Sequence, residues 1–285
     1  MRMQGRTWGF VVADDSSSAR LEPSELIDTT VPHSARVWNH WLGGKDNYPV
    51  DVELSEEFSE VFPGISELAR VSRYFLARTV RYLAGEAGIR QFLDIGTGLP
   101  TVDNTHEVAQ RVAPEAHVVY VDNDPLVLAH AHALLTSSPE GATHYIEADL
   151  GEPEAVLEKA GEVLDLSQPV ALTLMQVVGH VADYGQARSI VGRLLEGLPP
   201  GSYLALNDST DTNPANVEAT EHYNASGAVP YHIRSPEQIA GFFDGLDLVP
   251  PGVVPLPEWR PEAAPFGTAA GDIGAWGGVA RKSQP

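Results

Sequence analysis

A short glycine turn is the segment of this sequence best suited to bind a ligand. It runs from Asp94 to Gly98, follows an apolar stretch and precedes a segment with helical periodicity. In a doubly wound sheet, ligands bind beyond the carboxyl ends of the strands, where the first turn must let the backbone approach the ligand. Because glycine has no Cβ, Gly96 and Gly98 are expected to leave room there for a nucleoside or an amino-acid group.

A second acidic residue ends the next apolar run. Asp122 follows the stretch at 117–121. A carboxylate at the end of the second strand can accept hydrogen bonds from both hydroxyl groups of a ribose. A glycine pair alone could be no more than a tight turn. Together with Asp122, however, it predicts a ligand that contains a nucleoside.

The residues after the turn separate a nicotinamide dinucleotide from S-adenosylmethionine (SAM). The dinucleotide fingerprint has a third glycine where this chain has Thr101. Pro100 offers no N–H group to a pyrophosphate, and Asp103 would repel one. SAM has no phosphate, and its sulfonium and amino groups suit Asp94. These residues favour SAM, and with it a methyltransferase, over a nicotinamide-dependent oxidoreductase.

Two further candidates follow the third and fourth apolar runs. Asp149, with Leu150 beside it, could contact the adenine, or it could instead cap the next helix. His180 is the best-placed general base, because the ordinary pKa of histidine is near 6.5. A lone histidine is more often structural, and methyl transfer can proceed by positioning alone. The predicted cofactor contacts are Asp94, Gly96, Thr97, Gly98, Asp122, Asn123, Asp149, Leu150 and Gln176.

Composition and charge argue against several classes of protein. The formal net charge of −21, from 39 acidic and 18 basic residues, would repel nucleic acids. The chain has no cysteine, and its histidines show no zinc-type pairing, so no metal site is predicted. No stretch reaches the roughly 20 apolar residues of a membrane span. We therefore expect a cytoplasmic protein that acts on a small molecule.

Alternating strand and helix patterns must position these residues. Five apolar runs read as buried strands, and helical stretches separate them, which predicts a parallel sheet with helices on both faces. Ser235 and Pro236 are typical of a helix start. The expected strands are 91–95, 117–121, 143–147, 169–174, 201–207, 246–254 and 275–281; the expected helices are 101–112, 125–137, 154–163, 184–198, 235–243 and several within 34–86, interrupted at 39–49.

The segment from Ala35 to Tyr48, ARVWNHWLGGKDNY, resembles the signature of a bacterial family of SAM-dependent methyltransferases first catalogued as a domain of unknown function. The stretches 92–101, 104–107, 119–125 and 277–282 resemble that family in order and spacing. The resemblance covers the chain from about residue 30. It implies a class I methyltransferase: an α/β, Rossmann-like sheet of seven strands, the last antiparallel beside the fifth, under an N-terminal helical cover.

We thus expect a flexible extension at 1–22, a helical cover at 23–88 and a SAM-binding core at 89–285. Polar and aromatic residues beside the glycine pair of the cover suit a lid or a substrate wall. A helix end with solvated charges is the alternative. The sequence lacks a decisive catalytic motif, so the alternative function is a SAM-binding protein without turnover that acts as a sensor or as a partner of another protein. The predicted wall consists of Arg36, Trp38, Asn39, Gly44, Lys45, Asp46, Asn47 and Tyr48.

Overall fold

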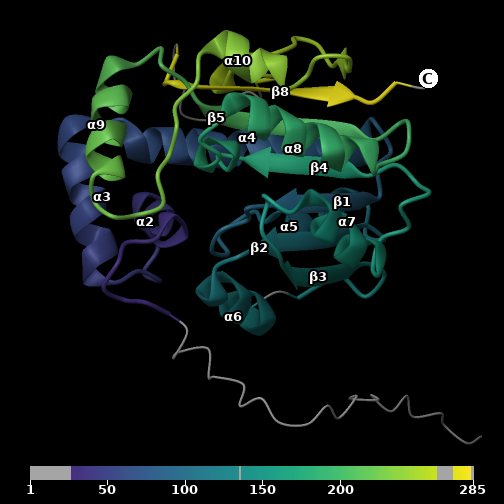
Figure 1. Cartoon of the computed structure of the whole chain (residues 1–285). Helices are drawn as coiled ribbons and strands as arrows, with labels where there is room; N and C mark the ends of the chain where they lie inside the picture. The colour runs from purple at the N-terminus through teal and green to yellow at the C-terminus, as the bar shows by residue number, and fades with distance from the viewer. Residues whose placement is uncertain (1–26, 135, 262–271, 284–285) are drawn as a thin grey trace, which may run out of the picture.

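The computed structural model describes residues 27–134, 136–261 and 272–283. Its centre is a sheet in the order β3-β2-β1-β4-β5-β8-β6, in which the first five strands are parallel (Figure 1). Strand β8 lies antiparallel beside β5, as the resemblance implied. The α/β fold is therefore confirmed. The strands are β1 (Gln91–Ile95), β2 (His117–Asp122), β3 (Ala142–Glu147), β4 (Ala171–Met175), β5 (Tyr203–Ser209) and β8 (Ala275–Arg281).

Within the described ranges, the sheet has eight strands instead of the seven expected. The run predicted at 246–254 is divided into β6 (Asp247–Leu248) and β7 (Val254–Pro255), which both pair with β8. A turn closed by the bond from Gly252 N to Val249 O separates them. Two prolines precede this glycine, and proline cannot donate to a strand ladder.

Helices cover both faces of the sheet and bury alternate strand residues. On one face, Phe92 packs into the apolar cluster with α4 (Ile65–Gly85) and α5 (Thr105–Val112). On the other face, Leu93 packs with α7 (Pro153–Gly161), α8 (Tyr184–Glu196) and α10 (Pro236–Gly241). This alternation follows the two-residue period of a strand. Helix α6 (Pro125–Leu134) contacts β3 at the edge.

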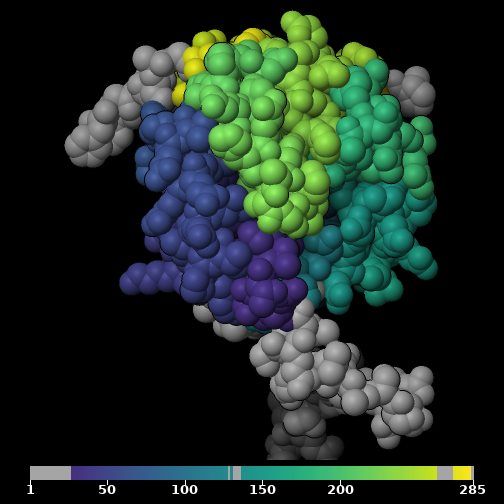
Figure 2. Space-filling model, turned by 60° about the vertical axis from the view of Figure 1, so that its left-hand side comes forward, coloured from purple at the N-terminus to yellow at the C-terminus, as the bar shows by residue number. Residues whose placement is uncertain are grey.

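Three helices gather where the parallel strands end, at the left of Figure 1: α2 (Ser34–Trp41), α3 (Pro49–Val61) and α9 (Pro214–Asn224). Helix α9 was not predicted, although Asn213 and Pro214 form an ordinary helix start. Figure 2 shows the purple and blue N-terminal helices against the light green segment that includes α9, and α3 contacts α9. Helix α4, which was predicted as part of the cover, packs on the sheet and also contacts α2 and α3.

Several predicted boundaries shift for local reasons. Helix α2 continues to Trp41, so the interruption expected from residue 39 begins at Leu42. Helix α5 begins at Thr105 and not at residue 101, because Asn104 N donates to Glu107 and the Asn104 side chain accepts from Thr101 N. The extension predicted at 1–22 lies outside the described residues. Within those residues, no helix is long and apolar enough to cross a membrane.

Candidate active site

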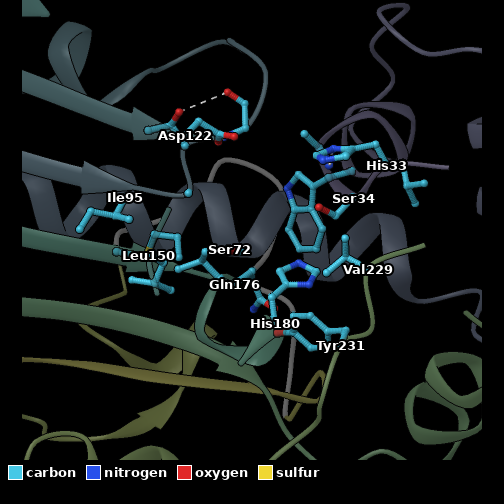
Figure 3. Close-up of a pocket in the computed structure, with 18 of the residues that line it drawn as sticks. His33, Ser34, Ser72, Ile95, Asp122, Leu150, Gln176, His180, Val229 and Tyr231 are labelled. Atoms are coloured by element: carbon cyan, nitrogen blue, oxygen red, sulfur yellow. Dashed lines mark hydrogen bonds between the residues drawn. The ribbon is translucent and has the colours of Figure 1, made fainter. Parts of the chain in front are cut away.

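A cavity of about 490 Å³ lies at the carboxyl ends of the strands, walled by residues of α2, α3, α4 and α9 (Figure 3). Its volume is in the usual range for small-molecule sites. Every predicted cofactor residue lines this cavity, and so does His180. The chain thus brings these residues together from the ends of four strands, although their contact with a cofactor stays a prediction.

Asp94 is the penultimate residue of β1 and lies on the face that carries α4 and α5. Its Oδ2 accepts a hydrogen bond of 2.6 Å from the Thr105 hydroxyl, and its Oδ1 accepts one of 2.7 Å from Thr173. Burial raises the pKa of this carboxyl, while the two hydroxyl groups oppose the rise. The carboxylate is therefore fixed in orientation, with lone pairs left on both oxygens.

The surroundings of the two glycines in the turn differ. Gly96 has φ +70°, and a Cβ there would lie 2.3 Å from Cγ2 of Val177, so close packing demands glycine. Gly98 has φ +64°, and a Cβ there would meet nothing within 4 Å. Only Gly98 faces open space. Both glycines line the cavity, so the expectation that they make room for a ligand stays a prediction, and packing against Val177 is a further reason for glycine at position 96.

Asp122 is held by the turn that it faces. Its Oδ2 accepts from Gly98 N at 2.9 Å, and its Oδ1 accepts from Asp124 N at 3.0 Å. Asp124 in turn pairs with His33, at 2.9 Å between Oδ2 and Nδ1. Burial raises the pKa of Asp122 despite its two backbone hydrogen bonds. The cover is thereby attached to the strand end through His33.

Asp149 is exposed and forms a turn of its own. Its Oδ1 accepts from Gly151 N at 2.7 Å, and its Oδ2 accepts from Asn123 Nδ2 at 2.9 Å. The N-cap residue of α7 is Glu152, so the alternative in which Asp149 caps that helix is wrong. Asp149 and Asn123 instead join the ends of β3 and β2 at the rim of the cavity.

Gln176 lies at the centre of a polar network after β4. Its Oε1 accepts from the hydroxyl groups of Ser209, at 3.0 Å, and Tyr231, at 2.9 Å, while its Nε2 donates to Asn207 at 3.0 Å. Its backbone has φ 56°, a left-handed conformation that is uncommon outside glycine. Such strained residues cluster at functional sites, where the surrounding contacts fix them.

His180 ends the short helix η1 (Val178–His180) and contacts Tyr231, with ring centroids 5.2 Å apart. Its Nδ1 lies 3.1 Å from the carbonyl oxygen of Pro230. Because a carbonyl only accepts, Nδ1 carries the proton in the neutral ring, and Nε2 keeps a lone pair. Burial lowers the pKa of His180, which favours this neutral form.

A buried arginine supports η1. Arg234 donates from Nη1 to Val178 O at 2.9 Å and from Nη2 to Val181 O at 2.6 Å. Asp208 lies 3.8 Å from Nη1, and burial raises the pKa of its carboxyl to about 7. The hydrogen bonds of the Arg234 guanidinium thus mainly fix the backbone on both sides of His180.

Arg73 of α4 is a cation on the cavity wall that the sequence did not reveal. Its Nη2 donates to Asp103 O at 3.1 Å, and its Nε is buried without a hydrogen-bond partner. Burial lowers the pKa of Arg73, and the nearby charge of Asp94 opposes this effect. Within the described ranges, Arg73 forms no ion pair with a carboxylate. A half-buried cation whose Nε has no partner is suited to an anionic ligand group.

Fewer residues of the predicted substrate wall line the cavity than expected. Of its residues, Trp38 and Asn39 line the cavity. The others do not: Gly44, Asp46 and Asn47 bond to each other or to Asn39 in the loop, Arg36 pairs with Asp51 and lies over Tyr48, and Lys45 is exposed. This loop is thus held by its own side chains, which agrees better with a structured helix end than with a substrate wall.

Other lining residues come from segments in which the sequence shows no motif. Tyr231 follows α9, Ser72 lies in α4, and Tyr223 is in α9. The hydroxyl of Tyr223 is buried without a hydrogen-bond partner. Only the fold brings these residues together, so no local pattern could have identified them.

This topology and the cavity at the strand ends define a class I SAM-dependent methyltransferase. Residues 20–283 match the model of the S-adenosyl methyltransferase family, and the chain belongs to that family. The match supports SAM as the cofactor and gives no support to the nicotinamide alternative.

Two solved structures resemble the chain over most of its length. One, a DUF574 family protein from Streptomyces avermitilis, is 46% identical, with a TM-score of 0.85, and the match covers 90% of this chain and 99% of that one. Another, assigned as a methyltransferase from Thermobifida fusca, is 39% identical, with a TM-score of 0.83, and the match covers 93% of this chain and all of that one (100%). No curated protein matches the sequence.

Proposed function

We propose that the protein transfers the methyl group of SAM to a small molecule and uses His180 as the general base. The observation that carries this proposal is the shared cavity, which the strand ends and His180 line together. Asp122 would bind the ribose hydroxyls, Asp149 and Leu150 the adenine, and Asp94 the amino group. Each assignment matches a hydrogen-bond acceptor or an apolar group to a part of SAM.

Arg73 completes this assignment. SAM carries a carboxylate at its methionine end, and Arg73 lines the cavity with a buried Nε that lacks a partner. Asp94, whose charge acts on Arg73, is proposed to bind the amino group of the same methionine. The pair would therefore hold the two charged groups of one amino acid with one residue of each sign.

His180 is the residue proposed to act on the methyl acceptor. When bound, SAM supplies an electrophilic methyl group on a sulfonium, which an acceptor atom attacks. The neutral His180 ring, held by Pro230 O at Nδ1, would take the acceptor's proton at Nε2. Arg234 and Tyr231 keep η1 and the ring in place.

Methyl-labelled SAM tests the proposal directly. The wild-type protein would be incubated with labelled SAM and a metabolite extract, beside His180→Gln and the matched control His222→Gln, which changes an exposed histidine of α9. We expect label in an extracted small molecule with the wild type and the control, and little with His180→Gln. Label that stays on SAM with the wild type would contradict the proposal.

A further inference from the structure

The cavity has a charged end and an uncharged end. Asp94, Asp122, Asp149 and Arg73 all lie at or beside the ends of β1, β2 and β3. The region between η1, α2 and α9 has none of these groups. In Figure 3, His180, Tyr231 and Val229 lie together, away from Asp122. SAM is proposed to bind the charged end, which leaves the uncharged end for the acceptor.

Apart from the Tyr223 hydroxyl, the main polar side chains at the uncharged end are already paired. Gln176 uses its amide on Asn207, Ser209 and Tyr231. His180 is favoured in its neutral form. The other ionisable side chain lining the cavity near this end is His33, and its Nδ1 is already paired with Asp124 Oδ2 at 2.9 Å. Among the described residues there, no unpaired charge is left to balance an ionic acceptor. A carboxylate or an ammonium group placed there would lose its hydration without gaining a counter-ion, which is strongly unfavourable.

Aromatic rings form the apolar part of this end. Trp38 meets Trp41 edge to face, with centroids 5.6 Å apart, and Trp41 meets Phe58 at 4.9 Å. Tyr231, from the segment after α9, adds a ring beside His180. Aromatic side chains favour stacked or edge-to-face contacts with other rings. The walls therefore suit a flat ring system better than a flexible chain.

From these observations we propose that the methyl acceptor is an uncharged molecule with a flat, largely apolar ring system and one acidic hydroxyl group. The hydroxyl oxygen would form a bond to the methyl carbon, the carbon–sulfur bond would break with its electron pair going to sulfur, and the hydroxyl proton would go to His180 Nε2. This acceptor class rests on the proposed function, because it takes the charged end of the cavity as the SAM site.

Four small probes test the class without knowledge of the natural acceptor. The full-length protein would be saturated with S-adenosylhomocysteine, the demethylated product, and titrated calorimetrically with naphthol, hydroxynaphthoate, aminomethylnaphthol and the saturated alcohol decahydronaphthol. These probes differ from naphthol in a negative charge, a positive charge and the loss of flatness, respectively. Trp38→Leu removes a ring from the wall, and Trp38→Phe keeps one.

We expect naphthol to bind at least about tenfold more tightly than each of the other three probes. Trp38→Leu should weaken naphthol binding at least about tenfold, and Trp38→Phe should restore most of it, with S-adenosylhomocysteine binding unchanged in both. Equal or tighter binding of a charged or saturated probe, or no binding of naphthol, would overturn the acceptor class. Failure of S-adenosylhomocysteine and SAM to bind would instead refute the proposed function.

Discussion

Replacing Arg73 by methionine is expected to weaken SAM binding by about 10- to 150-fold. The guanidinium lines the cavity and has one hydrogen bond, to Asp103 O. A hydrogen bond to a charged group contributes roughly 1.5–3 kcal/mol, and about 1.4 kcal/mol changes Kd tenfold. Methionine keeps most of the side-chain length and removes the charge, so the loss in affinity measures the contact with the SAM carboxylate.

The same substitution should leave the ligand-free protein at least as stable as the wild type. Arg73 is half-buried, its Nε is buried without a partner, and it forms no ion pair with a carboxylate in the described residues, so removing it relieves desolvation. The lost bond to Asp103 O offsets only about 1 kcal/mol of that gain. We therefore expect an unchanged or higher Tm without ligand, and a smaller rise in Tm when SAM is added.

Calorimetry with SAM and with decarboxylated SAM isolates the proposed contact. The wild type should prefer SAM, and Arg73→Met should bind the two ligands almost equally. Arg70→Met is the matched control, because Arg70 lies on the same helix and is exposed. If Arg73→Met keeps the full wild-type preference for SAM, the carboxylate is bound elsewhere and the assignment is refuted.

Three further predictions concern the base, the buried acid and the turn. His180→Gln should slow methyl transfer by about 100- to 10,000-fold with an unchanged Kd for SAM, and an unaltered rate in the variant would exclude His180 as the base. Because burial lowers the pKa of His180, wild-type activity should fall only below pH 6.5. Burial raises the pKa of Asp208 from 3.8 to about 7, so the folded state holds a proton that the unfolded state has lost between these values. Wild-type unfolding free energy should therefore fall by about 1.4 kcal/mol per pH unit across this window relative to Asp208→Asn, and parallel denaturation curves for the two proteins would contradict it. Gly96→Ala should lower the unfolding free energy by roughly 1–2 kcal/mol for its left-handed backbone, and further for the displacement of Val177. Gly98→Ala, with open space around its Cβ, should lower it by the backbone contribution alone. Equal losses of stability in thermal melting would refute the packing argument.

The sheet and the strand-end residues could be predicted because their signals are local. Each buried parallel strand is a short apolar run, and the fold places the residue after each run at one edge of the sheet. Asp94, Asp122 and Asp149 were thus placed from sequence alone on what is one cavity. The boundary errors were also local, as at α5, where the Asn104 side chain delays the helix start.

The function of the cover residues was harder to predict, because several of them bond within the loop and do not reach the cavity. Arg36 and Tyr48 have the composition of a polar binding wall, yet Arg36 is used on Asp51 and on the Tyr48 ring. The error at Arg73 was the reverse, because this residue lines the cavity although it was not predicted for the site. It lies in an amphipathic helix that reads as core packing, and its function depends on a cavity that only the tertiary structure creates.

The two halves of the cavity differ in how the chain builds them, and this difference has a consequence for specificity. The charged half comes mainly from successive strand ends, whose spacing is fixed by the hydrogen-bonded register of the sheet. The aromatic half comes from α2, α3, α9 and the segment after α9, which touch through side chains. Side-chain substitutions there can reshape the wall without moving a strand. The acceptor preference should therefore change readily with substitutions at positions such as Trp38 and Tyr231, while the affinity for SAM stays nearly constant.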